Sequence, residues 1–289
     1  MHTKLNSILI SADVVQGDDG IYSAQMPLSS LEQQAERDLR ERVVSRHYDN
    51  YLDAISRSHS ITVMDREVDR FLDKLPNGAV ILDIGGCWGW HWRRLATTRP
   101  DVGVIIVDFV RANLHYAMHL LGKLVGTQVA LIHADATALP FCDGNADGIG
   151  FNGVWTVQVF QHIPDFACAC HEAHRVLKVG GYFLNYSLHA TPLNQLIYRL
   201  LGKKFHLDGM MRNDFYLTRA NDDQRQIVAR IFRGEVLDRY TECLFHPDLK
   251  LYFTGRLGSY VARLDSRLGN LSLLGRLIAR QRSFEAIKI

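Results

Sequence analysis

The sequence predicts an α/β protein built on a mostly parallel sheet, and three observations lead to this. Ala79 to Ile84 is an apolar run broken only by Asp83, typical of a strand buried on both faces. Gly85 to Gly89 then lets the chain turn sharply before a helix expected to begin near Trp90. Gly103 to Asp108 is a second apolar run that ends in an acid. Strand, glycine loop and helix in this order indicate a nucleotide-type site at the carboxyl edge of an open sheet.

The spacing of the glycines indicates which kind of cofactor this loop accepts. A dinucleotide fingerprint needs glycine at its first, third and sixth positions, and here these are Gly85, Cys87 and Trp90. The Trp90 indole would block the close helix–strand packing that a glycine permits there, so NAD and FAD are disfavoured. Cys87 carries a Cβ, and we therefore expect no positive φ at this position.

Further segments repeat the pattern of a strand followed by a functional loop. Asp108 ends the second strand, and its carboxylate can accept hydrogen bonds from two vicinal ribose hydroxyls. Ala130 to Phe141 contains a third strand followed by Asp135, and Glu172 to Gly181 is a helix end and turn before another strand. Together these segments, about residues 79 to 188, resemble class I S-adenosylmethionine-dependent methyltransferases, closest to the type 11 methyltransferase group.

This resemblance implies a fold, a cofactor and a set of binding residues. The fold is a Rossmann-like, doubly wound α/β fold with a mostly parallel seven-stranded sheet and helical cap segments. The cofactor is S-adenosyl-L-methionine, with Asp108 on the ribose and Asp135 on the adenine amino group. No metal is expected. The cofactor-binding residues implied are Asp83, Gly85, Gly86, Gly89, Asp108, Phe109, Asp135, Ala136 and Gln158.

The remaining elements follow from periodicity and from the signals that begin and end helices. A capping box at Ser30 opens a helix to about Arg46, and a second helix covers Ile61 to Leu75. A short insertion is expected at Gly144 to Gly150, with Phe151-Asn152 opening the fourth strand and Gly153 to Phe160 as its body. After the fifth strand, Gly180 to Ser187, we expect helices at Pro192 to Leu201 and Asn221 to Phe232. Glu235 to Phe245 and Ser283 to Ile289 are expected to form an antiparallel edge hairpin around a basic helical insertion, about Gly258 to Arg282.

We expect one domain overall, made of four consecutive parts. Residues 1–60 form an N-terminal irregular segment and cap helices, and residues 61–189 form the cofactor-binding core. Residues 190–234 form a cap or substrate segment and a helix, and residues 235–289 hold the final strands with the basic helical insertion. Tyr48 and Tyr51 are expected to roof the pocket together with residues 190 to 220, because caps on a rigid scaffold carry specificity.

Composition excludes several classes of protein. The 289 residues are 47% hydrophobic and 22% charged, with a net charge of +2, which gives no attraction toward DNA. Five scattered cysteines indicate reduced thiols and a cytoplasmic location. No apolar run approaches the roughly 20 residues that span a bilayer. His115 with His119, and Cys168 with its neighbours, are interpreted as surface or packing residues rather than metal ligands.

The predicted function is methyl transfer to a small-molecule, lipid or glycan-intermediate acceptor, mainly by proximity and alignment. His162 and His189 follow the fourth and fifth strands and are the candidate general bases, since an ordinary histidine pKa of about 6.5 suits that role. An RNA or protein methyltransferase is the first alternative, because the C-terminal insertion is basic. A non-catalytic S-adenosylmethionine-binding protein is the second. Peripheral lipid contact through residues 193–204 and the oligomeric state stay open.

Overall fold

The computed structural model describes residues 14–26, 30–31, 33–42, 61–205, 208–210, 216–246 and 253–289. Within these residues, nine strands form one sheet in the order β1-β2-β5-β4-β3-β6-β7-β11-β10, and β8 and β9 form a small separate pair. The five pairings from β2 to β7 are parallel, so the expected mostly parallel sheet is confirmed. The predicted number of seven strands is wrong. The two extra strands, β1 and β2, have two residues each, too short to show an alternating pattern.

The strands of the large sheet, in spatial order, are β1 (Val15–Gln16), β2 (Tyr22–Ser23), β5 (Val129–His133), β4 (Gly103–Asp108), β3 (Val80–Ile84), β6 (Phe151–Val157), β7 (Leu177–Leu188), β11 (Gln281–Ile287) and β10 (Leu237–Thr241). The helices are α3 (Ile61–Asp73), α4 (Leu95–Thr98), α5 (Arg111–Leu121), α6 (Phe166–Val176), α7 (Pro192–Leu200), α8 (Asp222–Phe232), α9 (Gly255–Gly269) and α10 (Ser272–Ile278). Three short 3-10 turns are η1 (Trp90–Trp92), η2 (Gly122–Leu124) and η3 (Phe160–His162), and the small pair is β8 (Asp208–Met210) with β9 (Tyr216–Thr218). Residues 33–42 are also helical.

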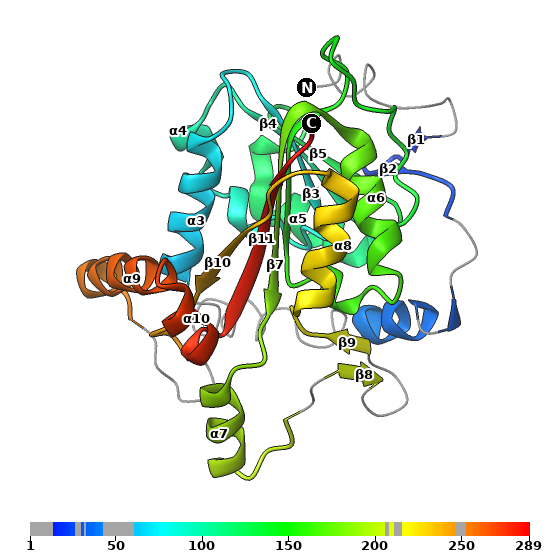
Figure 1. The fold of residues 1–289 in the computed structure, drawn as a ribbon. Coiled ribbons are helices and arrows are strands. Elements are labelled where there is room, and N and C mark those ends of the chain that lie inside the picture. The colour runs from blue at the N-terminus through cyan, green and yellow to red at the C-terminus, as the bar shows by residue number, and fades with distance from the viewer. Residues whose placement is uncertain are drawn as a thin grey trace.

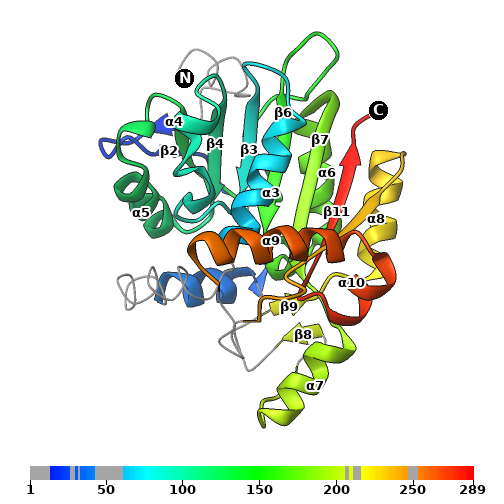
Figure 2. The same ribbon diagram turned by 90° about the vertical axis from the view of Figure 1, so that its left-hand side faces the viewer.

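Helices cover both faces of the sheet, as expected of a doubly wound fold (Figures 1 and 2). Alternate residues of β3 point to opposite faces, so Leu82 and Ile84 join one buried core while Ile81 joins the other. The first core packs against α6 and α8, and the second against α3 and α5. This burial on both faces explains why the parallel strands are nearly continuous apolar runs.

The edge where the parallel strands end carries the added segments. Figure 1 shows α7, β8, β9 and the helix of residues 33–42 gathered at this edge, below the sheet. The predicted edge hairpin is confirmed, because β10 pairs antiparallel with β11 and α9 and α10 lie between them in sequence. Since β11 is also antiparallel to β7, the first residue of β11 lies at the edge where β6 and β7 end.

Two local features of the core refine the expectations. The helix expected to begin near Trp90 is short, because the chain forms the 3-10 turn η1 there and then the four-residue α4. The fourth strand ends at Val157 rather than Phe160, because Gln158 has a left-handed backbone with φ of 57° and η3 follows. Its expected opening at Phe151 is confirmed. The division of the chain into four parts stays a prediction.

Among the residues that the structure describes, no helix combines the length and the apolar character needed to cross a bilayer.

Candidate active site

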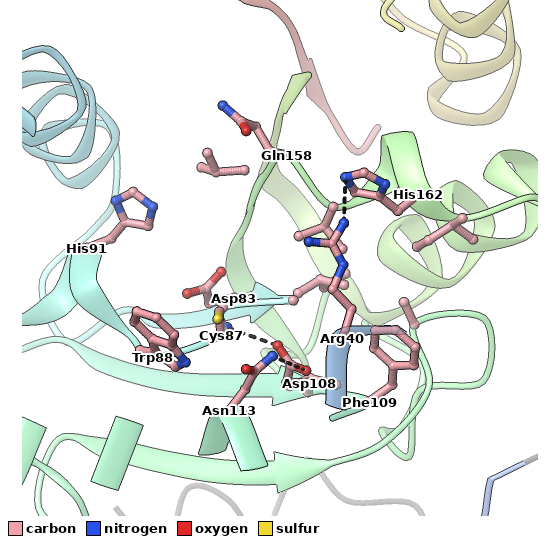
Figure 3. A pocket seen from close by; sticks show the side chains of 18 of the residues that line it. Arg40, Asp83, Cys87, Trp88, His91, Asp108, Phe109, Asn113, Gln158 and His162 are labelled. Carbon is pink, nitrogen blue, oxygen red and sulfur yellow. Dashed lines mark hydrogen bonds between the residues drawn. The ribbon is translucent and has the colours of Figure 1, made fainter. Parts of the chain in front are cut away.

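A pocket of about 260 Å³ opens at the carboxyl edge of the sheet, where β3, β4, β5 and β6 end. Eight of the nine predicted cofactor-binding residues line it, together with His162. The ninth, Gly89, lies in the same loop but is not among the lining residues. In Figure 3, Asp108 and Asn113 lie at one side of this pocket, and Gln158 and His162 at the other.

The glycine loop is held by its own packing. A Cβ on Gly86 would lie 2.3 Å from Oδ2 of Asp83, and one on Gly89 would lie 2.6 Å from a methyl of Leu121. Gly85 and Gly89 have φ of 68° and 67°, which glycine adopts without strain. The glycines therefore serve the fit of the loop onto the sheet as well as any ligand.

Cys87 differs from the expectation. Its φ is 50°, in the left-handed region that was not expected for this residue. The loop keeps the turn that a glycine would give. At this φ the backbone of Cys87 is strained by about 1–2 kcal/mol relative to a glycine. Cys87 lines the pocket, and its backbone N–H donates a 3.0 Å hydrogen bond to Oδ2 of Asp108.

Asp108 lies at the centre of a hydrogen-bond network. Its Oδ1 accepts from the backbone N–H of Val110 at 2.8 Å and from the amide of Asn113 at 3.2 Å (Figure 3). Burial raises the pKa of Asp108 to about 6, although these three donors act in the opposite direction. The carboxylate thus joins the ends of β3 and β4 and faces the pocket.

Asp135 and Asp83 complete a row of acids along the pocket. Oδ1 of Asp135 accepts from the N–H and the hydroxyl of Thr137, and Oδ2 accepts from Nε2 of Gln33 at 2.5 Å. Burial raises the pKa of Asp83 to about 7, opposed by a hydrogen bond from Trp92, and nearby Asp108 raises it further. Such acids favour a cationic ligand, because a positive charge would stabilise their charged forms.

Gln158 turns its side chain into the pocket from the end of β6. Its backbone N–H donates to the carbonyl of Tyr186 at 2.8 Å, which fixes the left-handed turn. Its Nε2 is buried and has no hydrogen-bond partner among the described residues. An unpaired buried amide donor costs roughly 1–3 kcal/mol, which a ligand acceptor would offset.

The helix of residues 33–42 contributes a cation and a carboxylate to the same pocket. Arg40 forms a 2.8 Å ion pair with Glu36, and its Nη2 lies 3.3 Å from Nε2 of His162. The other ring nitrogen of His162, Nδ1, lies 2.8 Å from the carbonyl of Tyr216. This carbonyl can only accept, so Nδ1 carries the proton and Nε2 is the acceptor. Burial lowers the pKa of His162 to about 3, and the nearby Arg40 charge lowers it further.

The second candidate base, His189, is not among the residues that line the pocket. Its ring is buried 5.6 Å from the ring of Tyr240. Burial lowers its pKa to about 4, assisted by the charge of Arg282. Tyr48 and Tyr51, expected to roof the pocket, lie outside the described residues. Trp88 and Trp92, which flank Trp90, are both buried.

The lining residues that the sequence did not indicate include Gln33, Glu36, Arg40 and Gln281. The first three share the face of a helix that lies over the pocket, and their spacing of three or four residues was a visible signal. Gln281 had no such signal, since only the antiparallel direction of β11 brings it to this edge.

Outside the pocket there is no metal cluster among the described residues, and two arginines of the basic insertion form ion pairs. Within the described residues, no three His, Cys, Asp or Glu side chains gather as a metal site. Of the arginines in the basic insertion, Arg280 pairs with Glu242, and Arg282 pairs with Asp238 and Asp222. These ion pairs reduce the positive charge that the insertion offers to a nucleic acid.

Comparison with known proteins agrees with this geometry. The family model described as a methyltransferase domain matches residues 82–185. The chain is 30% identical over 194 residues to a malonyl-[acyl-carrier protein] O-methyltransferase of Geobacter sulfurreducens, covering 66% of this chain and 69% of that protein. It is 30% identical over 154 residues to a demethylmenaquinone methyltransferase of Thermus thermophilus, covering 52% of this chain and 66% of that protein.

Among solved structures, an S-adenosylmethionine-dependent methyltransferase of Thermotoga maritima superposes with a TM-score of 0.55 at 14% identity, covering 89% of this chain and 100% of that one. At this identity the likeness shows the fold alone. The fold, the glycine loop and the relatives together place the chain in the family of S-adenosylmethionine-dependent methyltransferases. It is an enzyme of this class, as the sequence motifs predicted.

Proposed function

We propose that this protein transfers the methyl group of S-adenosylmethionine to a small-molecule, lipid or glycan-intermediate acceptor bound in the pocket at the carboxyl edge. The observation that carries the proposal is the row of buried acids, Asp83, Asp108 and Asp135, along one pocket beside a glycine loop. When bound, the cofactor supplies an electrophilic methyl group on a positively charged sulfur. The two relatives reported above are named for a carrier-bound malonyl group and for a quinone, which supports a small acceptor.

The residues present fit this cofactor. Asp108 offers a carboxylate for the ribose hydroxyls, and Asp135 with Ala136 lines the wall proposed for the adenine. The unpaired Nε2 of Gln158 is a donor suited to a carboxylate, and the cofactor has one at its methionine end. The raised pKa values of Asp83 and Asp108 mean that a cationic ligand relieves part of their burial cost.

In this proposal the protein acts mainly by alignment. Holding the acceptor in line with the transferred methyl group can supply on the order of 7–11 kcal/mol of the barrier. The role of His162 as a general base stays a prediction. Its Nε2 is already within reach of Arg40, and a pKa of about 3 makes the ring a weak proton acceptor at neutral pH.

The acceptor class is tested by incubating host lysate with methyl-labelled cofactor, with and without the protein. We expect label in the small-molecule or lipid fraction. Label confined to RNA or protein would replace this proposal with the first alternative, and cofactor binding without any transfer would favour a binding protein.

A variant tests the placement of the cofactor. Replacing Asp108 by Ala should weaken S-adenosylmethionine binding by roughly 1.5–3 kcal/mol, the usual contribution of charge-assisted hydrogen bonds. Calorimetry measures the affinity, and Asp101→Ala is the control because Asp101 is an acid outside the pocket, paired with Arg99. An unchanged affinity in the Asp108 variant would reject the proposed ribose contact.

A further inference from the structure

We propose that Gln281, the first residue of β11, recognises the methyl acceptor by accepting, at its Oε1, a hydrogen bond from an uncharged hydroxyl group. This inference rests on the proposed function and names the acceptor class more closely. Gln281 lies outside residues 79 to 188, the part of the sequence that resembles the methyltransferase family.

The side chain of Gln281 is buried, and its carbonyl oxygen lacks a hydrogen-bond partner among the described residues. Gln281 is 1% exposed and lines the pocket. A buried polar atom left unpaired costs roughly 1–3 kcal/mol. A ligand that supplies the missing partner removes this cost, so an unpaired amide in a pocket wall indicates a binding residue.

Because β11 runs antiparallel to β7, Gln281 lies at the carboxyl edge of the sheet, where the pocket opens. Gln281 pairs with Leu188, the last residue of β7, and with Thr241, the last residue of β10. The parallel strands end at this edge, whereas the antiparallel strand β11 begins there. The backbone of Gln281 is therefore fixed on both sides by strand pairing, which gives its amide a defined position.

The sheet order separates Gln281 from the residues proposed to hold the adenosine. Four strand spacings lie between β4, which carries Asp108, and β11, and five lie between β5 and β11. At about 4.8 Å for each spacing, these separations are about 19 Å and about 24 Å along the edge. Gln281 thus belongs to the part of the pocket away from Asp108 and Asp135, where an acceptor would enter.

The chemistry of an amide indicates the kind of group that it binds. A glutamine side chain carries one acceptor oxygen and two N–H donors and has no net charge. In Gln281 the unpaired atom is the acceptor oxygen, so the group that it binds must donate a hydrogen bond, as a hydroxyl does. A site built to hydrogen-bond an oxygen group discriminates strongly against analogues that lack it, because its buried polar atoms are then left unpaired.

The test compares Gln281→Met with Gln224→Met. Gln224 is a matched control, because it is 4% exposed and both its amide atoms lack partners among the described residues, yet it does not line the pocket. Three quantities are measured: the melting temperature without ligand, the affinity for S-adenosylhomocysteine by calorimetry, and label transfer into the small-molecule and lipid fractions of host lysate.

We expect Gln281→Met to lower transfer at least tenfold while the affinity for S-adenosylhomocysteine stays within threefold. Both variants should melt at or above the wild-type temperature, since each loses at least one buried amide atom that has no hydrogen-bond partner among the described residues. Gln224→Met should transfer label normally. If Gln281→Met does not fold, Gln281→Asn is tested in its place. This variant keeps the amide but shortens the side chain by one methylene, so its rate of methyl transfer should also fall.

The contrary outcomes are distinct. Normal transfer by either folded Gln281 variant overturns the inference and leaves the proposed function intact. A parallel loss of affinity for S-adenosylhomocysteine assigns Gln281 to the cofactor instead and also overturns it. A wild-type protein that labels no fraction overturns the proposed function, and the acceptor role of Gln281 with it.

Discussion

Nε1 of Trp92 donates a 2.7 Å hydrogen bond to Oδ2 of Asp83, and neither side chain is more than 1% exposed. The bond links the 3-10 turn η1 to the end of β3, so the indole fixes the turn that follows the glycine loop. It also favours the charged form of Asp83, against the effect of burial.

The first prediction concerns this bond. Trp92→Phe removes the indole donor, so the pKa of Asp83 should rise above its value of about 7. The free energy of unfolding should fall by about 1–3 kcal/mol at pH 8, where an ionised Asp83 is left without this partner, and by less at pH 6. Urea unfolding at both pH values measures this.

Trp90→Phe is the matched control, because Nε1 of Trp90 has no hydrogen-bond partner among the described residues. Its effect on the free energy of unfolding should be smaller and the same at both pH values. If the two tryptophan variants show equal losses at pH 8, the indole bond to Asp83 contributes nothing measurable.

The second prediction concerns pH. Burial raises the pKa of Asp83 to about 7 and that of Asp108 to about 6, whereas both carboxyls lose their protons near pH 4 in the unfolded chain. The folded state therefore binds more protons between about pH 4 and 7. The contribution of these acids to the stability of the ligand-free protein should fall as pH rises through this window.

Ligand binding should show the opposite trend. The affinity for cationic S-adenosylmethionine should increase as pH rises from 5.5 to 8, by about tenfold for each unit by which the ligand lowers the pKa of the acid pair. S-adenosylhomocysteine lacks the charged sulfur and should show a weaker dependence. Calorimetry with both ligands measures this, and two identical pH profiles would show that these acids do not interact with the sulfonium charge.

The sequence predicts the features of this fold that follow from a local pattern of residues, and not those that depend on contacts between distant parts of the chain. The parallel strands were predictable because burial on both faces leaves a continuous apolar run, as in β3. The acids at the strand ends were predictable for the same reason, since each follows such a run. The two-residue strands β1 and β2 gave no pattern, because their structure depends on the pairing of β2 with the edge of β5 and of β1 with β2.

The parts of the pocket outside this pattern depend on tertiary contacts. Cys87 adopts φ of 50° because its N–H is fixed by Asp108, a contact from another strand that overrides the local preference of cysteine. Gln281 reaches the pocket through the direction of β11, which no local signal gives. The pKa of His162 follows from its burial beside Arg40, about 120 residues earlier in the chain, so an exposed-histidine value was the only expectation available.

The third prediction concerns His162. Its Nδ1 donates to the carbonyl of Tyr216 and so connects η3 to β9. With a pKa of about 3, the ring is neutral throughout the range from pH 6 to 9. His162→Ala should therefore cost about 1–3 kcal/mol of stability through the unpaired carbonyl and leave the shape of the pH–rate profile unchanged.

A pH–rate profile measured on the folded variant decides between the two roles. If wild type shows an acidic limb near pH 6 to 7 that the variant lacks, with kcat lowered by about 10²–10⁴, His162 is a general base. An unchanged profile with lowered stability makes it a positioning residue between η3 and β9.

The last prediction concerns Cys87, whose left-handed backbone is strained for any residue with a Cβ. Cys87→Gly removes this strain of about 1–2 kcal/mol but gives the unfolded chain more conformational freedom, which costs about 0.4–1 kcal/mol. The variant should therefore melt at or slightly above the wild-type temperature. Cys87→Val adds a β-branch at the same φ of 50° and should melt well below it. Thermal unfolding of the three proteins measures this order, and a glycine variant less stable than wild type would show that the thiol packing outweighs the strain.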